Sequence, residues 1–380
     1  MSLGSRDPFQ DEAPAGQRLA ARLRESIRAS GPLTFRDWMA AALYDGRDGY
    51  YQRLGVERWG RAGDYRTAPE RSTLFAATFA RHFTRLYEEL GRPRVFNILE
   101  VGGGAGRFAH GVLSTLRRDA PHVYESVRYL FDEAGADSRG RAAELLKPFA
   151  ERVGFRRVSE MDDSLEHAVV FSNELLDAFP VHRVAARGGR LLESYVDVDG
   201  DRFVFVEREP STPRLGEHFE RLGVRLEEGQ VAEVNLELPA WLARTSALVG
   251  EGFLLTVDYG DEAATLYGAP HRREGTLRAF RGHELVEDVL REPGTQDLTA
   301  TVNWTQVVAE GERVGLEKLS LERLDAFLLR AGLVEQLELE SARAETEADL
   351  AALRLGAREM ILPGGMASHF QILVQKRAKS

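Results

Sequence analysis

A glycine-rich segment, ILEVGGGAGRF (98–108), carries the clearest chemical signal in this sequence. It follows an apolar run and opens a helical pattern, and its glycines are Gly102, Gly103, Gly104 and Gly106. Glycine permits a sharp turn and lets a ligand approach the backbone closely. A helix that starts there offers free N–H groups and the positive end of its dipole. Because a plain strand-to-helix turn needs fewer glycines, we predict that this loop binds a ligand.

Two cofactors are compatible with this loop. The string from Gly104 to Ala109 satisfies the dinucleotide pattern G-x-G-x-x-G/A. Glu100, at the end of the preceding apolar run, favours S-adenosyl-L-methionine instead, because a carboxylate suits a cationic sulfonium or ammonium group and repels a pyrophosphate. Glu133 ends the next apolar run, where a carboxylate can accept hydrogen bonds from the ribose hydroxyls of either cofactor. An NAD-dependent oxidoreductase therefore stays open as an alternative, although no Ser/Tyr-x-x-x-Lys pair suits hydride chemistry.

A second cluster of polar side chains follows the fourth apolar run, in FSNELLDAFPVHR (171–183). In doubly wound sheets, ligands bind beyond the carboxyl ends of the strands. Asn173, Glu174 and Asp177 are therefore expected to face the same cleft as the glycine loop. The alternative for Asn173 and Asp177 is that they cap a following helix, which both residue types do well.

Three further segments bear on the cleft. Asp258 and Tyr259 end a fifth apolar run and are expected to border it. Residues 275–304 form a long segment that reads as poor in regular structure, and such segments are often functional lids. Residues 63–75 read as a surface loop with a helix start near Ser72.

Several other chemistries lack their residues. The chain has no cysteine, and its nine histidines show no H-x-x-x-H spacing, so we expect no metal. Neither a G-x-S-x-G elbow nor a G-x-x-x-x-G-K-[ST] loop is present. The net charge of −10 argues against a general nucleic-acid binder. No apolar run approaches the length of a membrane helix and the first residues show no secretion signal, so we predict a cytoplasmic protein with no membrane insertion.

The elements that must position these groups alternate regularly from residue 95 onward. The apolar runs that read as strands are 95–102, 126–133, 154–159, 168–175 and 252–260. Helical patterns separate them, for example at 107–118 and 138–153. Strands buried on both faces and joined by helical crossovers predict a parallel, doubly wound α/β sheet.

The end of the chain extends this sheet. Residues 333–341 and 369–377 read as two more strands, preceded by helices at 321–332 and 345–361. The predicted fold is therefore a Rossmann-like α/β sheet of seven strands.

Two units flank the sheet. Residues 183–235 interrupt the alternation of strands and helices, and they contain a predicted β-hairpin around Asp199-Gly200. The exposed edge of that hairpin, at 191–207, is a candidate surface for a homodimer or a partner.

Residues 1–75 read as a helical and loop unit that covers the cleft. They contain an amphipathic, Arg-rich helix at 17–29, which we interpret as a surface helix with organelle targeting as the alternative. A second helix follows at 34–45, where Thr34 and Asp37 form a capping-box-like start. The main domain then comprises residues 76–182 and 236–380.

Taken together, these strings resemble the MidA-like class I S-adenosylmethionine-dependent methyltransferases. The strings that carry the resemblance are GPLTFRDWMAAALYDGRDGYY, GDYRTAPE, ILEVGGGAG, FSNELLDAFPVHRV, LLTVDYG and GTLRAFRGHELVEDVLREPGTQDLTATVNW. Their shared order is specific, and it spans roughly residues 31–375. Mitochondrial members of this family act as assembly factors of respiratory complex I and methylate an arginine.

The resemblance implies roles for the residues named above. Glu100, Gly102 and Gly104 lie at the methionine end of the cofactor, and Glu133 lies on its ribose. The methyl-transfer site is lined by Asn173, Glu174 and Asp177. The implied substrate is a protein, with a complex I subunit as one candidate.

This chain also departs from the family's pattern. Gly103 stands where many members have proline, and ATVNW (300–304) replaces a more polar string near the end of the lid segment. Substrate choice is therefore expected to differ.

The implied mechanism is an in-line displacement at a sulfonium carbon, in which the enzyme mainly aligns the reacting atoms. A carboxylate such as Glu174 could hold an arginine guanidinium by a charge-assisted pair, with Asp177 orienting its second face. An alternative function is an assembly or scaffold protein that keeps the fold with little catalysis.

Overall fold

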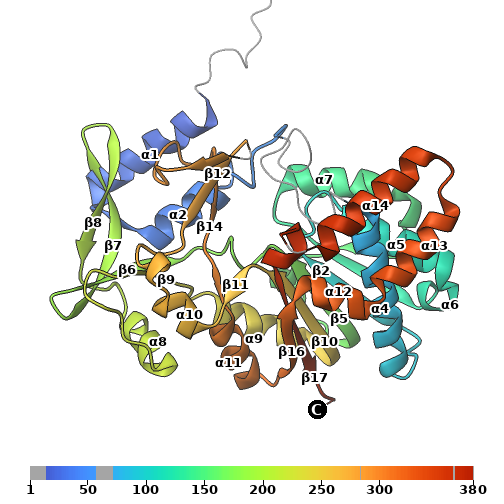
Figure 1. Cartoon of the computed structure of the whole chain (residues 1–380). Coiled ribbons are helices and arrows are strands. Elements are labelled where there is room, and N and C mark those ends of the chain that lie inside the picture. Colours follow the sequence, from blue (N-terminus) through green and yellow to red (C-terminus); the bar gives the residue numbers. More distant parts are fainter. Residues whose placement is uncertain (1–13, 57–71, 283, 363, 380) are drawn as a thin grey trace, which may run out of the picture.

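A sheet of seven strands forms the centre of the molecule (Figure 1). The computed structural model describes residues 14–56, 72–282, 284–362 and 364–379. The strand order is β16-β17-β10-β5-β2-β3-β4. The strands are β2 (Phe96–Val101), β3 (Val127–Asp132), β4 (Val153–Phe155), β5 (Leu165–Asn173), β10 (Val249–Asp258), β16 (Glu317–Arg323) and β17 (Gln371–Arg377). β2, β3, β4, β5 and β10 run parallel, and β17 is antiparallel to both of its neighbours. The predicted seven-stranded Rossmann-like α/β fold is confirmed.

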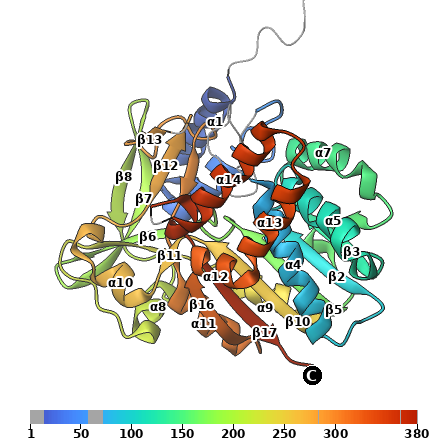
Figure 2. The ribbon, with the colours of Figure 1, turned by 45° about the vertical axis from the view of Figure 1, so that its right-hand side comes forward.

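Helices cover both faces of this sheet (Figure 2). One core packs against α4 (Thr73–Glu89), α5 (Arg107–Asp119), α12 (Leu324–Ala331) and α14 (Glu347–Ile361), and the other against α9 (Leu238–Leu248) and α11 (Trp304–Arg313). Every residue of β2 is buried, as the continuous apolar run predicted. On the first face, Phe108 stacks on Phe171 at 4.2 Å between ring centroids, and Phe79 contacts Phe171 at 4.9 Å. These rings join α4 and α5 to the central strand.

A second sheet, with strand order β1-β7-β6-β9, lies beside the first, and β8 pairs with β7. Its strands are β1 (Leu33–Thr34), β6 (His182–Arg187), β7 (Arg190–Asp199), β8 (Arg202–Arg208) and β9 (Val231–Val234), and α8 (Arg214–Leu222) packs against it. The predicted hairpin is present: Asp199 pairs with Arg202, and Gly200 has a φ of 61°. β1 pairs with β7, so the chain before residue 35 and the inserted hairpin share one sheet.

The N-terminal helices pack against a distant segment of the chain. α1 (Ala15–Ser30) and α2 (Phe35–Tyr44) share a hydrophobic core with Ala279, Leu298 and Ala300 (Figure 1). Thr34 caps α2 as predicted, since its side chain accepts a hydrogen bond from the Asp37 N–H. The division of the chain into units 1–75, 76–182 with 236–380, and 183–235 stays a proposal.

Two predictions about elements near the end of the chain need correction. Residues 333–341 are not a strand but belong to α13 (Leu333–Arg343), and the seventh strand is β16. β16 lies at the sheet edge with four of its seven residues exposed and none buried, so it lacks the apolar run of a buried strand. The predicted helix at 321–332 correspondingly begins only at Leu324.

Residues 275–304 are also more regular than predicted. They contain β12 (Arg278–Arg281), β13 (Glu284–Val286) and β14 (Asp297–Thr299), which form a three-stranded sheet. β15 (Val302–Asn303) then pairs with β11 (Gly260–Asp261). These strands are too short for periodicity to reveal them.

The remaining elements differ from the predictions in their ends or are short. The weak strand at 154–159 is limited to β4, and the helix at 138–153 is α7 (Ala136–Leu145) followed by η1 (Lys147–Phe149). Of the predicted loop at 63–75, residues 63–71 lie outside the described residues, and Ser72 caps α4 through the Leu74 N–H. The short helices are α6 (Pro121–Tyr124), α10 (Ala263–Gly268), η2 (Val158–Glu160), η3 (Pro270–Arg272) and η4 (Met366–His369).

Across the described ranges, no helix has the length and apolar character needed to cross a bilayer.

The aromatic contacts around Phe79 predict a large contribution to stability. Replacing Phe79 with Ala removes a fully buried ring, and we expect the free energy of unfolding to fall by about 3–5 kcal/mol. Leu355→Ala, on the exposed side of α14, serves as the control and should change it by less than about 0.5 kcal/mol. Denaturant unfolding measures both, and equal losses in the two variants would contradict the packing described above.

Candidate active site

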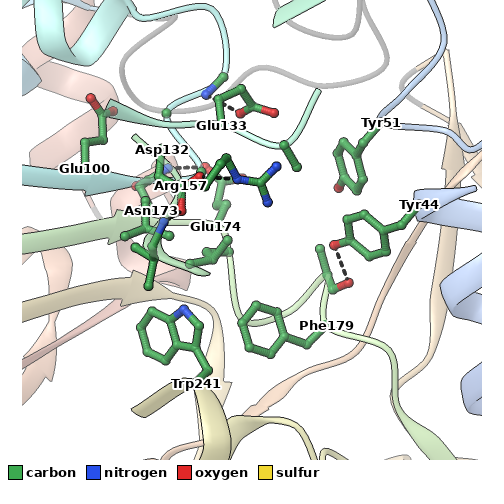
Figure 3. Close-up of a pocket in the computed structure, with 18 of the residues that line it drawn as sticks. Tyr44, Tyr51, Glu100, Asp132, Glu133, Arg157, Asn173, Glu174, Phe179 and Trp241 are labelled. Atoms are coloured by element: carbon green, nitrogen blue, oxygen red, sulfur yellow. Dashed lines mark hydrogen bonds and ion pairs between the residues drawn. The ribbon is translucent and has the colours of Figure 1, made fainter. Parts of the chain in front are cut away.

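A cavity of about 510 Å³ opens at the carboxyl ends of β2, β3 and β5 (Figure 3). Its volume lies in the range typical of small-molecule sites. The glycine loop and the ends of these strands form one side, and α2 and α9 form the other. The structure places the following predicted residues on its wall: Glu100, Gly102, Gly103, Gly104, Glu133, Asn173 and Glu174. Gly106 and Asp177 do not line this cavity.

The glycine loop turns with its backbone close to its neighbours. Gly102 has a φ of 74°, a conformation that side chains rarely adopt. A Cβ atom on Gly103 would lie 2.3 Å from Cε2 of Phe131, so that ring fills the space of a side chain at 103. Gly106 precedes α5, and a Cβ atom there would lie 3.0 Å from that of Ala142. Gly106 therefore serves helix packing, whereas the other glycines expose backbone to the cavity.

Glu100 is a buried carboxyl on the cavity wall. It is 4 % exposed, and the Tyr129 hydroxyl donates a hydrogen bond of 2.7 Å to its Oε2 atom. Burial raises the pKa of Glu100 to about 8. A cation bound nearby would favour the ionised form of this carboxyl.

The neighbouring acids Asp132 and Glu133 have different tasks. Asp132 pairs with Arg157 at 2.7 Å and accepts a hydrogen bond from the Val158 N–H at 2.9 Å. These contacts join the end of β3 to the residues that follow β4. Glu133 accepts hydrogen bonds from the N–H groups of Gly104, at 2.8 Å, and Gly135, at 2.6 Å. Burial raises the pKa of Glu133. Its carboxylate keeps acceptor capacity for a ligand, because two oxygens offer about four sites.

The turn after β5 holds Glu174 in a strained conformation. Glu174 has a φ of 53°, unusual for a residue with a side chain, and such strain is concentrated at functional sites. The Asn173 side-chain amide donates a hydrogen bond of 2.9 Å to Glu174 Oε1. Residues 174–181 form turns, so the alternative of helix capping by Asn173 and Asp177 is wrong.

Asp258, at the end of β10, accepts hydrogen bonds from the backbone of this turn. It is fully buried, and its Oδ2 atom accepts hydrogen bonds from the N–H groups of Leu175, at 3.3 Å, and Leu176, at 3.0 Å. Burial and the nearby acids raise its pKa well above the usual range. The sequence placed Asp258 beside the cleft, but its contacts show that it supports the backbone there.

Asp177 lines a second, smaller cavity of about 170 Å³. It is 4 % exposed, and the Tyr259 hydroxyl donates a hydrogen bond to its Oδ2 atom. Burial raises the pKa of Asp177 to about 6. Glu174 and Tyr51 line both cavities.

Several aromatic and charged residues that line the larger cavity were not predicted from the sequence. Tyr44 and Tyr51, from the N-terminal unit, face the cavity opposite the strand ends, and Trp241 lies on the α9 side (Figure 3). An ion pair between Arg36 of α2 and Glu237 at the start of α9 joins these two helices. Nothing in the spacing of these residues indicates the cleft, because the three-dimensional fold alone brings them there.

The cavity has the features that S-adenosylmethionine requires. Its glycine backbone is open to a ligand, Glu133 can accept hydrogen bonds, and Glu100 suits a cationic group. Among the residues that the structure describes, no cluster of His, Asp and Glu could hold a metal ion.

Comparison with known proteins identifies the family. A family model described as "Putative S-adenosyl-L-methionine-dependent methyltransferase" matches residues 78–321. The chain belongs to this family. This match confirms the resemblance that the sequence of the methyltransferase showed. The alternative of a dinucleotide cofactor is wrong.

Similar proteins support the same assignment. The methyltransferase is 27% identical to the mitochondrial protein arginine methyltransferase NDUFAF7 homolog of Drosophila melanogaster, over 92% of this chain and 86% of that protein. Mitochondrial NDUFAF7 of Mus musculus is also 27% identical, over 82% and 76% of the two chains. A Burkholderia thailandensis protein crystallised with S-adenosyl-homocysteine superposes with a TM-score of 0.85 at 28% identity, and covers 100% of this chain and 96% of its own. The cofactor of this methyltransferase is therefore S-adenosylmethionine.

The same relatives correct one prediction. The curated proteins are named as mitochondrial, and this finding contradicts the predicted cytoplasmic location. The cytoplasmic prediction depended on the lack of a membrane-length apolar run and of a secretion signal, neither of which distinguishes the cytosol from the interior of an organelle.

The raised pKa of Glu100 predicts that binding of S-adenosylmethionine releases a proton. Without the cofactor, Glu100 is mostly protonated at pH 7, and the cationic cofactor should favour its carboxylate, so roughly one proton should leave. Calorimetry in two buffers with different ionisation enthalpies measures this release, which Glu100→Gln should abolish. Equal binding heats for the wild-type protein in both buffers would contradict the prediction.

Proposed function

We propose that this methyltransferase transfers a methyl group from S-adenosylmethionine to an arginine side chain of a protein. The observation that carries this proposal is the position of Glu174, a strained carboxylate that borders both cavities. The names of the curated relatives, which are protein arginine methyltransferases, also support it.

The cofactor would occupy the larger cavity. We assign its ribose to Glu133 and its charged methionine end to the backbone of Gly102, Gly103 and Gly104 together with Glu100. Asn173 would lie beside the methyl group. Gly106, which was predicted to contact the cofactor, is assigned to helix packing instead.

The bound cofactor supplies a methyl carbon on a positively charged sulfur, which is already a good leaving group. The task of the protein is alignment, which can contribute about 7–11 kcal/mol in the best cases. A guanidinium is a poor nucleophile because its lone pairs are delocalised. Glu174 would pair with two of its N–H groups, orient the third nitrogen and localise electron density there.

The nitrogen then forms a bond to carbon as the carbon–sulfur electron pair returns to sulfur. One proton must leave the methylated nitrogen. Glu174, or Asp177 with its pKa of about 6, is the nearest acceptor that this site offers. A base with a strongly raised pKa is not needed, because the proton leaves after the carbon–nitrogen bond has formed.

We propose two finer assignments. The family resemblance supports a respiratory complex I subunit as the protein substrate. The outer edge of β8, which pairs with no other strand in the described part of the chain, supports a homodimer, and light scattering of the purified chain tests it.

Glu174→Gln tests the function directly. The variant keeps the shape of the side chain but loses the charge that holds the guanidinium, so methyl transfer should fall by about 10- to 100-fold. Labelled-methyl transfer to arginine-containing peptides or lysate proteins measures activity, and calorimetry with S-adenosyl-homocysteine should show unchanged binding. The control is Glu262→Gln, an exposed acid that lines neither cavity.

Each outcome separates the candidate functions. Full turnover by Glu174→Gln would refute the role of this carboxylate. Tight cofactor binding without transfer to any protein, in the wild-type chain, would favour the alternative of an assembly protein that keeps the fold.

A further inference from the structure

The smaller cavity adjoins the larger one. Glu174 and Tyr51 line both, so a group held in the smaller cavity meets the cofactor site at these two side chains. Its other walls come from the end of β10 and from β12 and β14. This cavity is therefore assembled from three distant parts of the chain: the N-terminal unit, the main sheet and residues 275–304.

The smaller cavity is rich in acids. Its walls carry three carboxyl groups, from Glu174, Asp177 and Asp297. The Tyr51 hydroxyl donates a hydrogen bond of 2.8 Å to Asp297 Oδ1, so this acid already has a partner. Acids gathered around one small cavity repel one another, and a cation among them relieves that repulsion.

One acceptor in this cavity has no partner. Asp177 Oδ1 is buried and makes no hydrogen bond of good geometry with the described residues, although the N–H groups of Ala178 and Asp177 lie near enough to the carboxyl group to lower its pKa. Its other oxygen accepts a hydrogen bond from Tyr259. A buried carboxylate oxygen without a donor is costly, which indicates a donor that is supplied by a ligand.

A guanidinium of the chain itself already lies at this cavity. Arg278 is the one cation among its described lining residues, and its Cζ atom lies 5.4 Å from the centre of the Tyr259 ring. Its Nη2 atom donates a hydrogen bond of 3.3 Å to Thr301 Oγ1. Arg278 is exposed, so the group stacks on the tyrosine from the solvent side.

We propose that the smaller cavity is the acceptor site, that it binds a guanidinium group, and that Arg278 covers its mouth until the substrate arginine displaces it. This inference rests on the proposed function. Asp177 Oδ1 would accept a hydrogen bond from one guanidinium nitrogen, and Glu174 would hold another toward the larger cavity.

The walls favour a guanidinium over an ammonium. A guanidinium is planar, stacks on aromatic rings and donates in several directions within one plane. Tyr51, Tyr259 and Phe280 supply aromatic walls, and the carboxylates accept from its edges. A lysine ammonium would meet the acids but would not use the rings in this way.

The test uses the full chain saturated with S-adenosyl-homocysteine. Three probes are compared by calorimetry or ligand-observed NMR: N-acetyl-arginine amide, its lysine counterpart, and its citrulline counterpart, which is a neutral isostere. We expect the arginine probe to bind at least about tenfold more tightly than the other two. Asp177→Asn should weaken its binding by about tenfold or more, since a charged acceptor is lost.

Arg278→Gln tests whether Arg278 covers the mouth of the smaller cavity. Removing the competing guanidinium should strengthen binding of the arginine probe. Arg281→Gln is the matched control, because Arg281 lies on the same strand, pairs with Glu292 and lines neither cavity. It should leave binding unchanged.

Equal binding of the three probes, or wild-type affinity in Asp177→Asn, would overturn the acceptor site. Unchanged or weaker binding in Arg278→Gln would overturn the role of Arg278. A wild-type chain that failed to bind S-adenosyl-homocysteine at all would instead refute the proposed function, so the two failures are distinguishable.

Discussion

The buried carboxylate of Asp258 is the constraint on which the rest of the site depends. β10 and β5 are parallel neighbours, so the ends of both strands reach the same edge of the sheet. From β10, Asp258 accepts hydrogen bonds from the backbone just beyond β5, and this holds the turn that carries Glu174. The strain at Glu174 persists because the surrounding structure holds it in place, and the result is a carboxylate at the junction of two cavities.

The second requirement is closure of the cleft by segments outside the main sheet. α1 and α2 share a core with residues 279–300, so the beginning and the later part of the chain form one cover. This cover supplies Tyr44 and Tyr51, and the Arg36–Glu237 ion pair joins it to the α9 side. Exclusion of water by such a cover strengthens every charged contact inside the cavity.

Much of the architecture was predictable because buried parallel strands leave a strong pattern. β2, β3, β5 and β10 are apolar on both faces and end in glycines or polar groups, which also indicated the site. The pattern does not predict β16, because an exposed edge strand has no continuous apolar run. Residues 333–341 were wrongly predicted as a strand, because the apolar residues of α13 alternate with polar ones over a short stretch. The role of Asp258 and the positions of Tyr51 and Asp297 depend on contacts between distant segments, which no local pattern records.

The two cavities take their walls from different segments of the chain. The glycine loop and Glu133, to which we assign the cofactor, belong to the main sheet, whereas half of the residues that line the smaller cavity belong to the short strands of residues 275–304. Under the proposed acceptor site, mutations in those strands would alter which side chain is admitted without disturbing the glycine loop or Glu133. Substrate selectivity and cofactor binding would then be separable, because different segments of the chain supply them.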